Sequence, residues 1–355
     1  MKILYDHQIF TEQIYGGISR YFIELCKQMS NSEIDYLIQA TIHQNYYLDK
    51  ASVNKSFNLY LKDYPKFTRK LIGSTNKYFF YKNINKNYYK IFHNTYYSNF
   101  KLKNNITQIS TIYDFTHEIF SKEYNYKKNI KTEAIKNSNH FICISENTKK
   151  DLIKFYNIKP DNISVVYLGG DHLPKGNKIF KNKPFILYVG YRENYKNFNI
   201  LLKAFYSSRK LQKDFDIVCF GGSPFNDDEI NQISQYALTD SVKYISGDDH
   251  KLSSLYSTAS CHVITSKYEG FGITVVEAYN FGCPVIHTGK GSLAEIADES
   301  GQYDGSYENL KHTLEKFLYS NQDIKNHRIN IKKIKNRLTW KNCFNNTYDV
   351  YKKFL

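Results

Sequence analysis

The sequence predicts an α/β protein with two doubly wound domains, each built on a parallel sheet between layers of helices. Three observations support this fold class. Short apolar runs alternate with amphipathic segments along the chain, which is typical of strands and helices in such layers. The alternation pauses at a polar connector over 169–183 and then starts again. The length of 355 residues is enough for two domains with full cores.

In the first half, strands are predicted over 2–5, 109–113, 141–144 and 164–167. Helices are predicted over 18–26 and 146–155. The first helix has Ile18, Tyr21 and Leu25 on one face, and the second follows Ser145, a natural N-cap.

In the second half, strands are predicted over 185–189, 216–220, 242–245 and 261–264, and helices over 198–206, 229–236 and 252–258. The tail over 339–354 is predicted to be helical and contains the only tryptophan, Trp340. We place the domain boundary in the polar connector. This gives an N-terminal domain over 1–177, a second domain over 178–338 and a C-terminal helix over 339–355.

The stretch 266–286 is the most informative part of the sequence. Glu269 and Glu277 stand eight positions apart, and a turn, Gly270-Phe271-Gly272, leads into a short apolar helix. The backbone N–H groups at the start of a helix suit a phosphate, and each carboxylate can accept hydrogen bonds from hydroxyl groups. Two hydroxyl acceptors beside a phosphate site are what a nucleotide-sugar requires.

Two glutamates at this spacing are, taken alone, more often ordinary solvated side chains. The whole stretch, however, resembles the signature of the retaining family 4 glycosyltransferases: Ser-x-x-Glu-Gly-Phe-Gly, a few apolar residues, Glu-Ala, then Gly-x-Pro-Val-Ile. It departs mildly at Ile273-Thr274, where the family often carries an aliphatic residue and proline. The resemblance implies the GT-B fold, in which two Rossmann-like domains face each other across a cleft. It also implies that the C-terminal helix crosses back to the first domain.

A second loop, from Gly190 to Asn197, follows the predicted strand over 185–189 and carries Arg192 and Lys196. Both side chains suit a diphosphate, and loops at the carboxyl ends of strands face the ligand crevice of open sheets. Two cations on a loop are more often solvated than functional. This segment nevertheless resembles the family's Gly-x-Arg-x-x-x-Lys-Asn hallmark, which is completed by Leu-Leu-x-Ala-Phe at 201–205.

The resemblance assigns roles within the second domain, mostly over 184–335. Arg192 and Lys196 would neutralise the departing diphosphate, Glu269 would hold sugar hydroxyls and Glu277 the ribose. Donor-binding backbone positions would be Gly190, Gly270, Phe271, Gly272 and Ile273.

Two features of the first half also bear on the site. Gly16 and Gly17 precede a helix without the G-x-G-x-x-G spacing of a dinucleotide site. The family uses this loop beneath the donor phosphate and acceptor, while a plain structural turn remains equally open. Many relatives carry His-Asp after the strand over 109–113, where this chain has Tyr113-Asp114 and then His117. Asp114 and His117 are therefore expected on the acceptor side, although a lone histidine is more often structural.

No metal and no cofactor are expected. The D-x-D sequence over 214–216 runs directly into a strand, and Asp248-Asp249-His250 lies in a loop. In this fold, basic side chains and helix N-termini can offset the leaving-group charge. The six cysteines are scattered without a CxxC pair, which indicates reduced core residues of a cytoplasmic protein. Neither a signal peptide nor a membrane span is indicated.

The formal net charge is +15, and the window 51–103 holds 11 basic residues, 14 aromatic residues and the single acid Asp63. Such a surface could contact an anionic membrane or bind nucleic acid. AT-rich coding favours the same residue types, and only 6 of the 49 basic residues are arginine. We expect no nucleic acid, and contact of 51–103 with the inner face of the plasma membrane stays an option.

The predicted activity is that of a retaining, metal-independent hexosyltransferase. It would move a sugar from GDP-mannose or a UDP-hexose to a growing saccharide, such as a lipid-linked O-antigen, capsule or lipopolysaccharide intermediate. The segments 5–10 and 92–97 resemble a subgroup that builds bacterial surface polysaccharides. Two alternatives are a nucleotide-sugar 2-epimerase of the same fold and a non-catalytic basic protein that binds nucleic acid.

Overall fold

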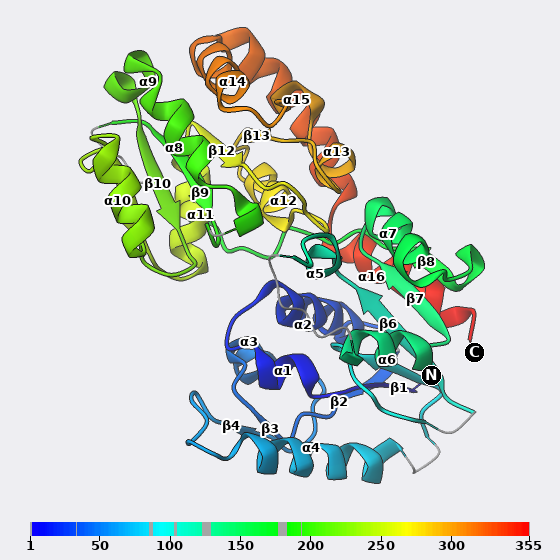
Figure 1. The fold of residues 1–355 in the computed structure, drawn as a ribbon. Coiled ribbons are helices and arrows are strands. Elements are labelled where there is room, and N and C mark those ends of the chain that lie inside the picture. Colours follow the sequence, from blue (N-terminus) through cyan, green and yellow to red (C-terminus); the bar gives the residue numbers. More distant parts are fainter. Residues whose placement is uncertain are drawn as a thin grey trace. The chain divides into compact units, whose positions relative to one another are not determined.

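The computed structural model describes residues 2–32, 34–84, 88–102, 105–122, 129–176, 183–192 and 194–354. The chain forms two compact units (Figure 1). Unit 1 comprises Met1–Glu118, Asn125–Leu168 and Trp340–Leu355, and unit 2 comprises Ile119–Tyr124 and Gly169–Thr339. The predicted boundary at 177/178 lies outside the described residues, and the units divide earlier, after Leu168. The sequence did not predict that a piece of the first half belongs to unit 2.

Unit 1 is built on a parallel sheet with the strand order β2-β1-β5-β6-β7-β8. Its strands are β1 (Lys2–Tyr5), β2 (Asp35–Ile38), β5 (Ile91–Asn94), β6 (Thr107–Ile112), β7 (His140–Cys143) and β8 (Ile163–Val165). Two short strands, β3 (Ile42–His43) and β4 (Leu59–Tyr60), come between β2 and β5 in the sequence and form a separate parallel pair. The direction of winding reverses between β1 and β5, which makes that pair the switch point of the sheet.

The helices of unit 1 are α1 (Gln8–Glu12), α2 (Gly17–Ser30), α3 (Tyr46–Lys50), α4 (Arg69–Ile84), α5 (Thr116–Ile119), α6 (Asn129–Asn137), α7 (Glu146–Tyr156) and α16 (Trp340–Lys352), with a 3₁₀ turn over Pro160–Asn162. The predicted N-cap of α7 is confirmed, because the Ser145 hydroxyl accepts a hydrogen bond from the Thr148 N–H at 3.0 Å.

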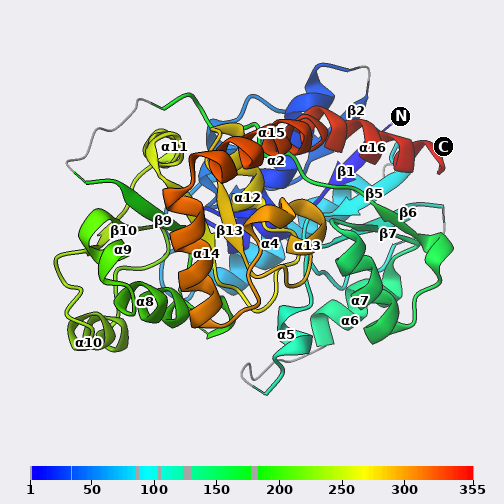
Figure 2. The ribbon, with the colours of Figure 1, turned by 90° about the horizontal axis from the view of Figure 1, so that it is seen from above.

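The C-terminal helix α16 packs against α2 in unit 1 (Figures 1 and 2). The Tyr351 hydroxyl lies 2.9 Å from the Tyr5 hydroxyl and 2.6 Å from His93 Nδ1, all three groups being buried. Trp340 is buried against the Tyr21 ring, with centroids 6.3 Å apart. The expectation that the last helix crosses back to the first domain is confirmed.

Unit 2 is built on a five-stranded parallel sheet with the order β11-β10-β9-β12-β13. Its strands are β9 (Phe185–Val189), β10 (Asp216–Phe220), β11 (Val242–Ile245), β12 (Cys261–Ile264) and β13 (Val285–His287). The four strands predicted over 185–264 are confirmed. The winding reverses between β9 and β12, so these two strands form the switch point of this sheet.

The helices of unit 2 are α8 (Asn199–Tyr206), α9 (Arg209–Asp214), α10 (Asp227–Gln235), α11 (Asp249–Thr258), α12 (Ile273–Asn280), α13 (Leu293–Ile296), α14 (Tyr307–Tyr319) and α15 (Asn321–Arg337), with 3₁₀ turns over Asn194–Lys196 and Glu299–Gly301. Within the described ranges, no helix combines the length and the apolar character needed to cross a membrane. All six cysteines are buried, and no disulfide joins any two of them.

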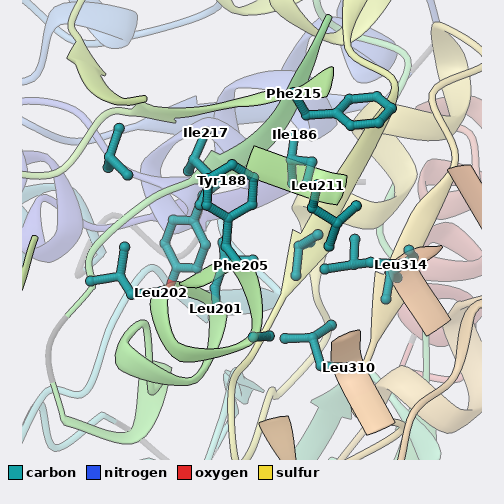
Figure 3. Packing of buried hydrophobic residues seen from close by; sticks show 14 of the residues in the cluster. Ile186, Tyr188, Leu201, Leu202, Phe205, Leu211, Phe215, Ile217, Leu310 and Leu314 are labelled. Atoms are coloured by element: carbon teal, nitrogen blue, oxygen red, sulfur yellow. The ribbon is translucent and has the colours of Figure 1, made fainter. Parts of the chain in front are cut away.

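The core of unit 2 lies between one face of its sheet and the helix pair α8 and α14, as Figure 3 shows. Leu201 and Phe205 of α8 and Leu310 of α14 are fully buried, and they pack with Ile186 of β9 and Ile217 of β10. This apolar layer fixes α8 and therefore the loop that precedes it, which carries Lys196.

Candidate active site

The two sequence motifs meet at the switch point of the unit 2 sheet. Strands β9 and β12 pair in parallel there. The loop over 190–197 follows the carboxyl end of β9, and the loop over 265–272 follows the carboxyl end of β12. Open α/β sheets bind ligands outside the carboxyl ends of the strands at such a point, because neighbouring loops diverge there.

Lys196 and Glu269 form an ion pair at this point. Lys196 Nζ lies 2.7 Å from Glu269 Oε1, and the two side chains are 24% and 15% exposed. Burial opposes the charged form of Lys196, but the Glu269 carboxylate outweighs it and raises the pKa of Lys196 above its usual value. Lys196 is therefore a protonated cation at neutral pH. The sequence predicted both residues for the site without predicting that they would pair.

The backbone around Lys196 is fixed by hydrogen bonds from the two strands and the facing loop. The Thr265 hydroxyl donates to the Lys196 carbonyl at 2.6 Å, and the Tyr188 hydroxyl donates to the Tyr191 carbonyl at 3.2 Å. The Lys267 N–H donates to the Tyr195 carbonyl at 2.8 Å. These bonds fix the backbone at Tyr191, Tyr195 and Lys196, so that the ammonium group of Lys196 is presented to Glu269.

The ammonium group of Lys196 also makes a cation–π contact with the ring of Tyr195. Lys196 Nζ lies 5.0 Å from the Tyr195 ring centroid. Phe120, which belongs to unit 2 with its neighbours, stacks on the same ring with centroids 5.7 Å apart. Phe120 was missed by sequence reasoning, since it lies 75 positions from Tyr195 in the chain and only the fold brings the two rings together.

The Glu269 turn is held from the other side by the loop over 288–293. The Glu269 carbonyl accepts hydrogen bonds from the Ser292 N–H and hydroxyl, both at 3.0 Å. Gly291, with φ +63°, approaches so closely that a Cβ there would collide with the Glu269 backbone. Gly272 has φ +81° and caps α12, and Phe271 is buried beneath the turn.

Helix α12 begins at Ile273, directly after this turn, so the N–H groups of its first turn lie beside the Gly270–Ile273 segment. Within α12, Glu277 is buried, and each of its carboxylate oxygens lies near a side chain from another segment. The Tyr256 hydroxyl donates to Glu277 Oε2 at 3.2 Å, and His172 Nε2 lies 3.2 Å from Glu277 Oε1. Neither Tyr256 nor His172 carried a sequence signal, because α11 and the connector reach Glu277 only through the fold.

Arg192 makes its contacts inside unit 2, and its predicted role at the diphosphate stays a prediction. Its side chain is 3% exposed, its Nε donates to Glu229 Oε1 at 2.8 Å, and its Nη atoms donate to the carbonyls of Gly221 and Pro224 at 3.3 and 3.2 Å. Glu229 is also part of the capping box of α10. Arg192 therefore ties this helix start to the loop after β9, and its donors are occupied within unit 2.

Gly190 also serves the local fold. Its φ is +111°, and its N–H donates to the Phe220 carbonyl at 2.9 Å. Gly222 lies so close that a Cβ there would sit 2.9 Å from the Gly190 carbonyl oxygen. These glycines let the loops after β9 and β10 run side by side.

The glycines predicted in unit 1 begin helix α2. Gly16 is the N-cap, with Gly17 as the first helical residue. A side chain at Gly16 would collide with that of Gln13, whose Oε1 accepts from the Ser19 N–H at 3.2 Å, while a Cβ at Gly17 would meet nothing within 4 Å. Packing against Gln13 therefore requires glycine at position 16, whereas the space beside Gly17 at the start of the helix is open.

Asp114 and His117 lie together in unit 1, where both line a cavity of about 220 Å³. The other lining residues are Ile18, Tyr96, Tyr97, Tyr113, Ile130 and Lys131. Asp114 Oδ1 accepts from the Thr116 N–H at 2.9 Å and so starts α5. Lys131 Nζ donates to the Asp114 carbonyl at 2.7 Å. Three tyrosines and one carboxylate line this cavity, and we call it the tyrosine cavity.

The aspartates that could have suggested a metal have other partners. Asp214 accepts from the Tyr319 hydroxyl at 2.7 Å, and Asp216 pairs with Lys243 at 2.7 Å. Asp248 caps α11 by accepting from the Lys251 N–H. Across the described part of the chain, no group of three or more His, Cys, Asp or Glu side chains is arranged to hold a metal ion.

Two family models match the chain, one for each half. Residues 15–172 match Glycosyltransferase Family 4, and residues 171–335 match Glycosyl transferases group 1. A curated relative, O-antigen chain mannosyltransferase B of Escherichia coli, is 24% identical over 183 residues, which cover 48% of each chain. The chain spans about half the length, or less, of the curated relatives it matches.

Solved structures share the fold along almost the whole chain. A glycosyltransferase from Rickettsia africae ESF-5 has a TM-score of 0.72 at 17% identity and covers 99% of this chain and 98% of its own. WaaG, a glycosyltransferase involved in lipopolysaccharide biosynthesis, has a TM-score of 0.71 at 13% identity and covers 99% of both chains. At these identities the likeness shows the fold, and the predicted fold class is confirmed.

Proposed function

We propose that this chain, which belongs to the group 1 and family 4 glycosyltransferases of the GT-B fold, is a retaining hexosyltransferase that uses a nucleotide-sugar without a metal. The observation that carries the proposal is the Lys196–Glu269 pair at the switch point of the unit 2 sheet. It sets a protonated amine and a hydroxyl acceptor beside the first turn of α12, where a sugar diphosphate needs them.

The donor would exchange the internal pair for its own contacts. Its diphosphate would draw Lys196 away from Glu269 and accept hydrogen bonds from N–H groups around Gly270–Ile273. Glu269 would then be free to accept hydrogen bonds from the sugar hydroxyls, and Glu277 from the ribose. Because Lys196 is charged before the donor arrives, it can stabilise the negative charge that grows on the diphosphate as the glycosidic bond breaks.

The chemistry would need positioning more than a protein base. The acceptor hydroxyl would attack the anomeric carbon from the face that the diphosphate leaves, and its proton would pass to the diphosphate. One carbon–oxygen bond breaks, another forms on the same face, and the configuration is retained. Holding the reacting groups in place supplies much of the rate enhancement in such reactions.

The acceptor would be a growing saccharide that binds at the tyrosine cavity of unit 1. Tyrosine rings can stack on the apolar faces of sugar rings, and Asp114 and His117 offer polar contacts at the cavity wall. GDP-mannose or a UDP-hexose is the proposed donor, and a lipid-linked O-antigen, capsule or lipopolysaccharide intermediate the proposed acceptor. The name of the Escherichia coli relative, an O-antigen chain mannosyltransferase, supports this choice.

The test is a thermal-shift panel of UDP-, GDP-, ADP- and dTDP-sugars without added metal, followed by hydrolysis assays on any donor that binds. We expect one donor class to raise the Tm, since a ligand at 100 times its Kd adds about 2.7 kcal/mol to the stability of the folded state. Glu277→Ala should abolish the shift, and Glu308→Ala, an exposed glutamate on α14, should keep it. A folded sample that responds to no donor would count against the proposal.

Peripheral membrane contact through 51–103 is part of the proposal. This window is strongly basic, and it exposes large apolar side chains such as Phe57 and Phe67, a combination that suits an anionic leaflet. In a flotation assay at low salt, the protein should rise with vesicles that contain anionic lipid and stay behind with neutral ones. No flotation with anionic vesicles would end this part of the proposal.

A further inference from the structure

Unit 1 contains a second cavity, of about 180 Å³, at the switch point of its own sheet. Its wall includes His7, which follows β1, and Asn99 and Phe100, which follow β5. The same segment after β5 supplies Tyr96 and Tyr97 to the tyrosine cavity. One stretch of chain, 96–100, therefore contributes to the walls of both cavities.

Helix α4 forms another wall of this cavity, and its orientation is fixed. Ile72, Asn76 and Phe80 face inward and are buried. The Asn76 side chain accepts from the Ile42 N–H at 2.9 Å and donates to the Ile42 carbonyl at 2.8 Å, which ties α4 to β3. The neighbouring row on the helix, one residue further along, lines the cavity: Arg69, Gly73 and Lys77.

Gly73 has no packing reason to be glycine. It lies inside α4, where glycine is unfavourable compared with alanine. A Cβ added at Gly73 would meet no heavy atom within 4 Å. The missing side chain leaves open space between Arg69 and Lys77, one helical turn to each side, at the wall of the cavity.

The charges around that space favour an anion. Neither Arg69 nor Lys77 makes an ion pair or a side-chain hydrogen bond with any residue in the ranges that the structure describes. Among the described residues that line the cavity, Glu12 is the one acid. His7 is buried, and burial lowers its pKa to about 4, so it is a neutral hydrogen-bonding group. The cavity wall is left with two cations against one carboxylate.

We infer that this cavity binds a phosphate group, which is held between Arg69 and Lys77 over the open face of Gly73. The inference rests on the proposed function, and it adds that the acceptor of this transferase carries a phosphate. A saccharide in the tyrosine cavity would contact Tyr96 and Tyr97, and the phosphate of its carrier would bind beside Asn99 of the same segment. Arg69 can bind two phosphate oxygens with its planar fork, and Lys77 adds a point charge.

Calorimetry with inorganic pyrophosphate tests the inference on the full chain carrying Lys196→Ala, which weakens the diphosphate site of unit 2. Added to this background, Arg69→Ala or Lys77→Ala should each weaken pyrophosphate binding about tenfold, the usual effect of losing one charge-assisted contact. Lys70→Ala is the matched control, since Lys70 is an exposed cation of the same helix outside the cavity wall. It should leave the affinity unchanged.

Gly73 provides a steric test. Gly73→Leu should fill the space and abolish binding, while Gly73→Ala should raise the Tm and keep most of the affinity. Circular dichroism melts show whether each variant is folded. An absence of pyrophosphate binding in the Lys196→Ala background, or an equal loss in Lys70→Ala, would overturn the inference.

A vesicle arm separates the possible sources of the phosphate. If binding to phosphatidylglycerol vesicles depends on Arg69 and Lys77 and is competed by pyrophosphate, the group is a lipid headgroup. If vesicle binding ignores these variants while pyrophosphate binding follows them, the phosphate belongs to the acceptor. Both results support a phosphate site, and the first removes the statement that the acceptor carries the phosphate. Because binding is measured without turnover, a failed donor panel would remove the proposed function and leave this site standing.

Discussion

At Lys196, a single side chain combines a fixed position with a fixed charge. Its backbone carbonyl accepts the Thr265 hydroxyl, its ammonium group faces Glu269, and Tyr195 supports it. Most ion pairs near a protein surface add little to the stability of the folded state and have no further role. Here the pair lies at a switch point of the sheet, and we propose that a diphosphate and sugar hydroxyls replace the two partners of the pair.

Lys196→Ala should therefore lower kcat by about 10²–10³, the range found when one group that stabilises developing charge is removed. The fold should survive, because the side chain is partly exposed and anchors no core. Steady-state kinetics with the donor found in the thermal panel measure the effect. Lys267→Ala, an exposed lysine on the facing loop, is the control and should keep its rate; an unchanged rate in Lys196→Ala would remove this residue from the mechanism.

A second prediction at the scale of residues concerns Asp6, which is fully buried at the end of β1. Burial raises the pKa of Asp6 to about 7, against the opposing hydrogen bonds from Thr95. The unfolded chain loses this proton near pH 4, while the folded chain keeps it until about pH 7. The Asp6 contribution to stability therefore falls as the pH rises from 4 to 7 and is constant above that.

Asp6→Asn should stabilise the protein at pH 8, on the order of 1–3 kcal/mol, because the amide has no charge to bury. At pH 5 the gain should be nearly gone, since Asp6 is then protonated in the folded chain. Urea denaturation of both proteins at the two pH values measures the difference. The same gain at both pH values would show that Asp6 is not protonated in the folded state.

At the scale of elements, the hydroxyl group of Tyr351 is one of the buried contacts that attach α16 to unit 1. Tyr351→Phe removes the hydrogen bonds with Tyr5 and His93 and leaves buried polar groups without a partner. This should cost about 1–3 kcal/mol of unfolding free energy. Tyr348→Phe, on the same helix and only partly buried, should cost much less. Equal losses in the two variants would mean that the buried hydroxyl contributes nothing specific.

The strands that flank the donor site could be predicted, because each is a short apolar run with a polar boundary. Phe185–Val189 and Cys261–Ile264 are such runs. Helix α4 was not predicted, since Tyr78-Phe79-Phe80-Tyr81 is apolar on all sides and hides the helical period, although only Phe80 is fully buried. Periodicity identifies a helix only when its outer face is polar.

The candidate site could be predicted in part, namely for the residues that stand in sequence motifs. Lys196, Glu269 and Glu277 stand in motifs, and the structure places them at one sheet edge and the helix that follows it. The partner of Arg192 could not be predicted, because Glu229 lies on α10, 37 positions further along the chain, and meets the guanidinium only in the folded unit. A motif identifies residue types in order, and partners from distant segments depend on packing.

At the scale of the whole molecule, the proposed donor site lies in unit 2, whereas the tyrosine cavity and the proposed phosphate cavity lie in unit 1. The donor alone should therefore slow hydrogen exchange over 190–197 and 265–277, and leave α4 and the segment after β5 unchanged, because a ligand protects the structure that it binds. Exchange measured by mass spectrometry with and without the donor tests this. Protection confined to unit 1 would contradict the assignment of the donor to unit 2.

The return of the last helix to unit 1 has a consequence for protein synthesis. Domains generally fold in the order in which they leave the ribosome. Here the contacts of Tyr351 with Tyr5 and His93 cannot form until the chain beyond Thr339 has been made. Unit 2, which ends at Thr339, is the unit that can finish first, and the N-terminal sheet has to wait for the final segment before its core is closed.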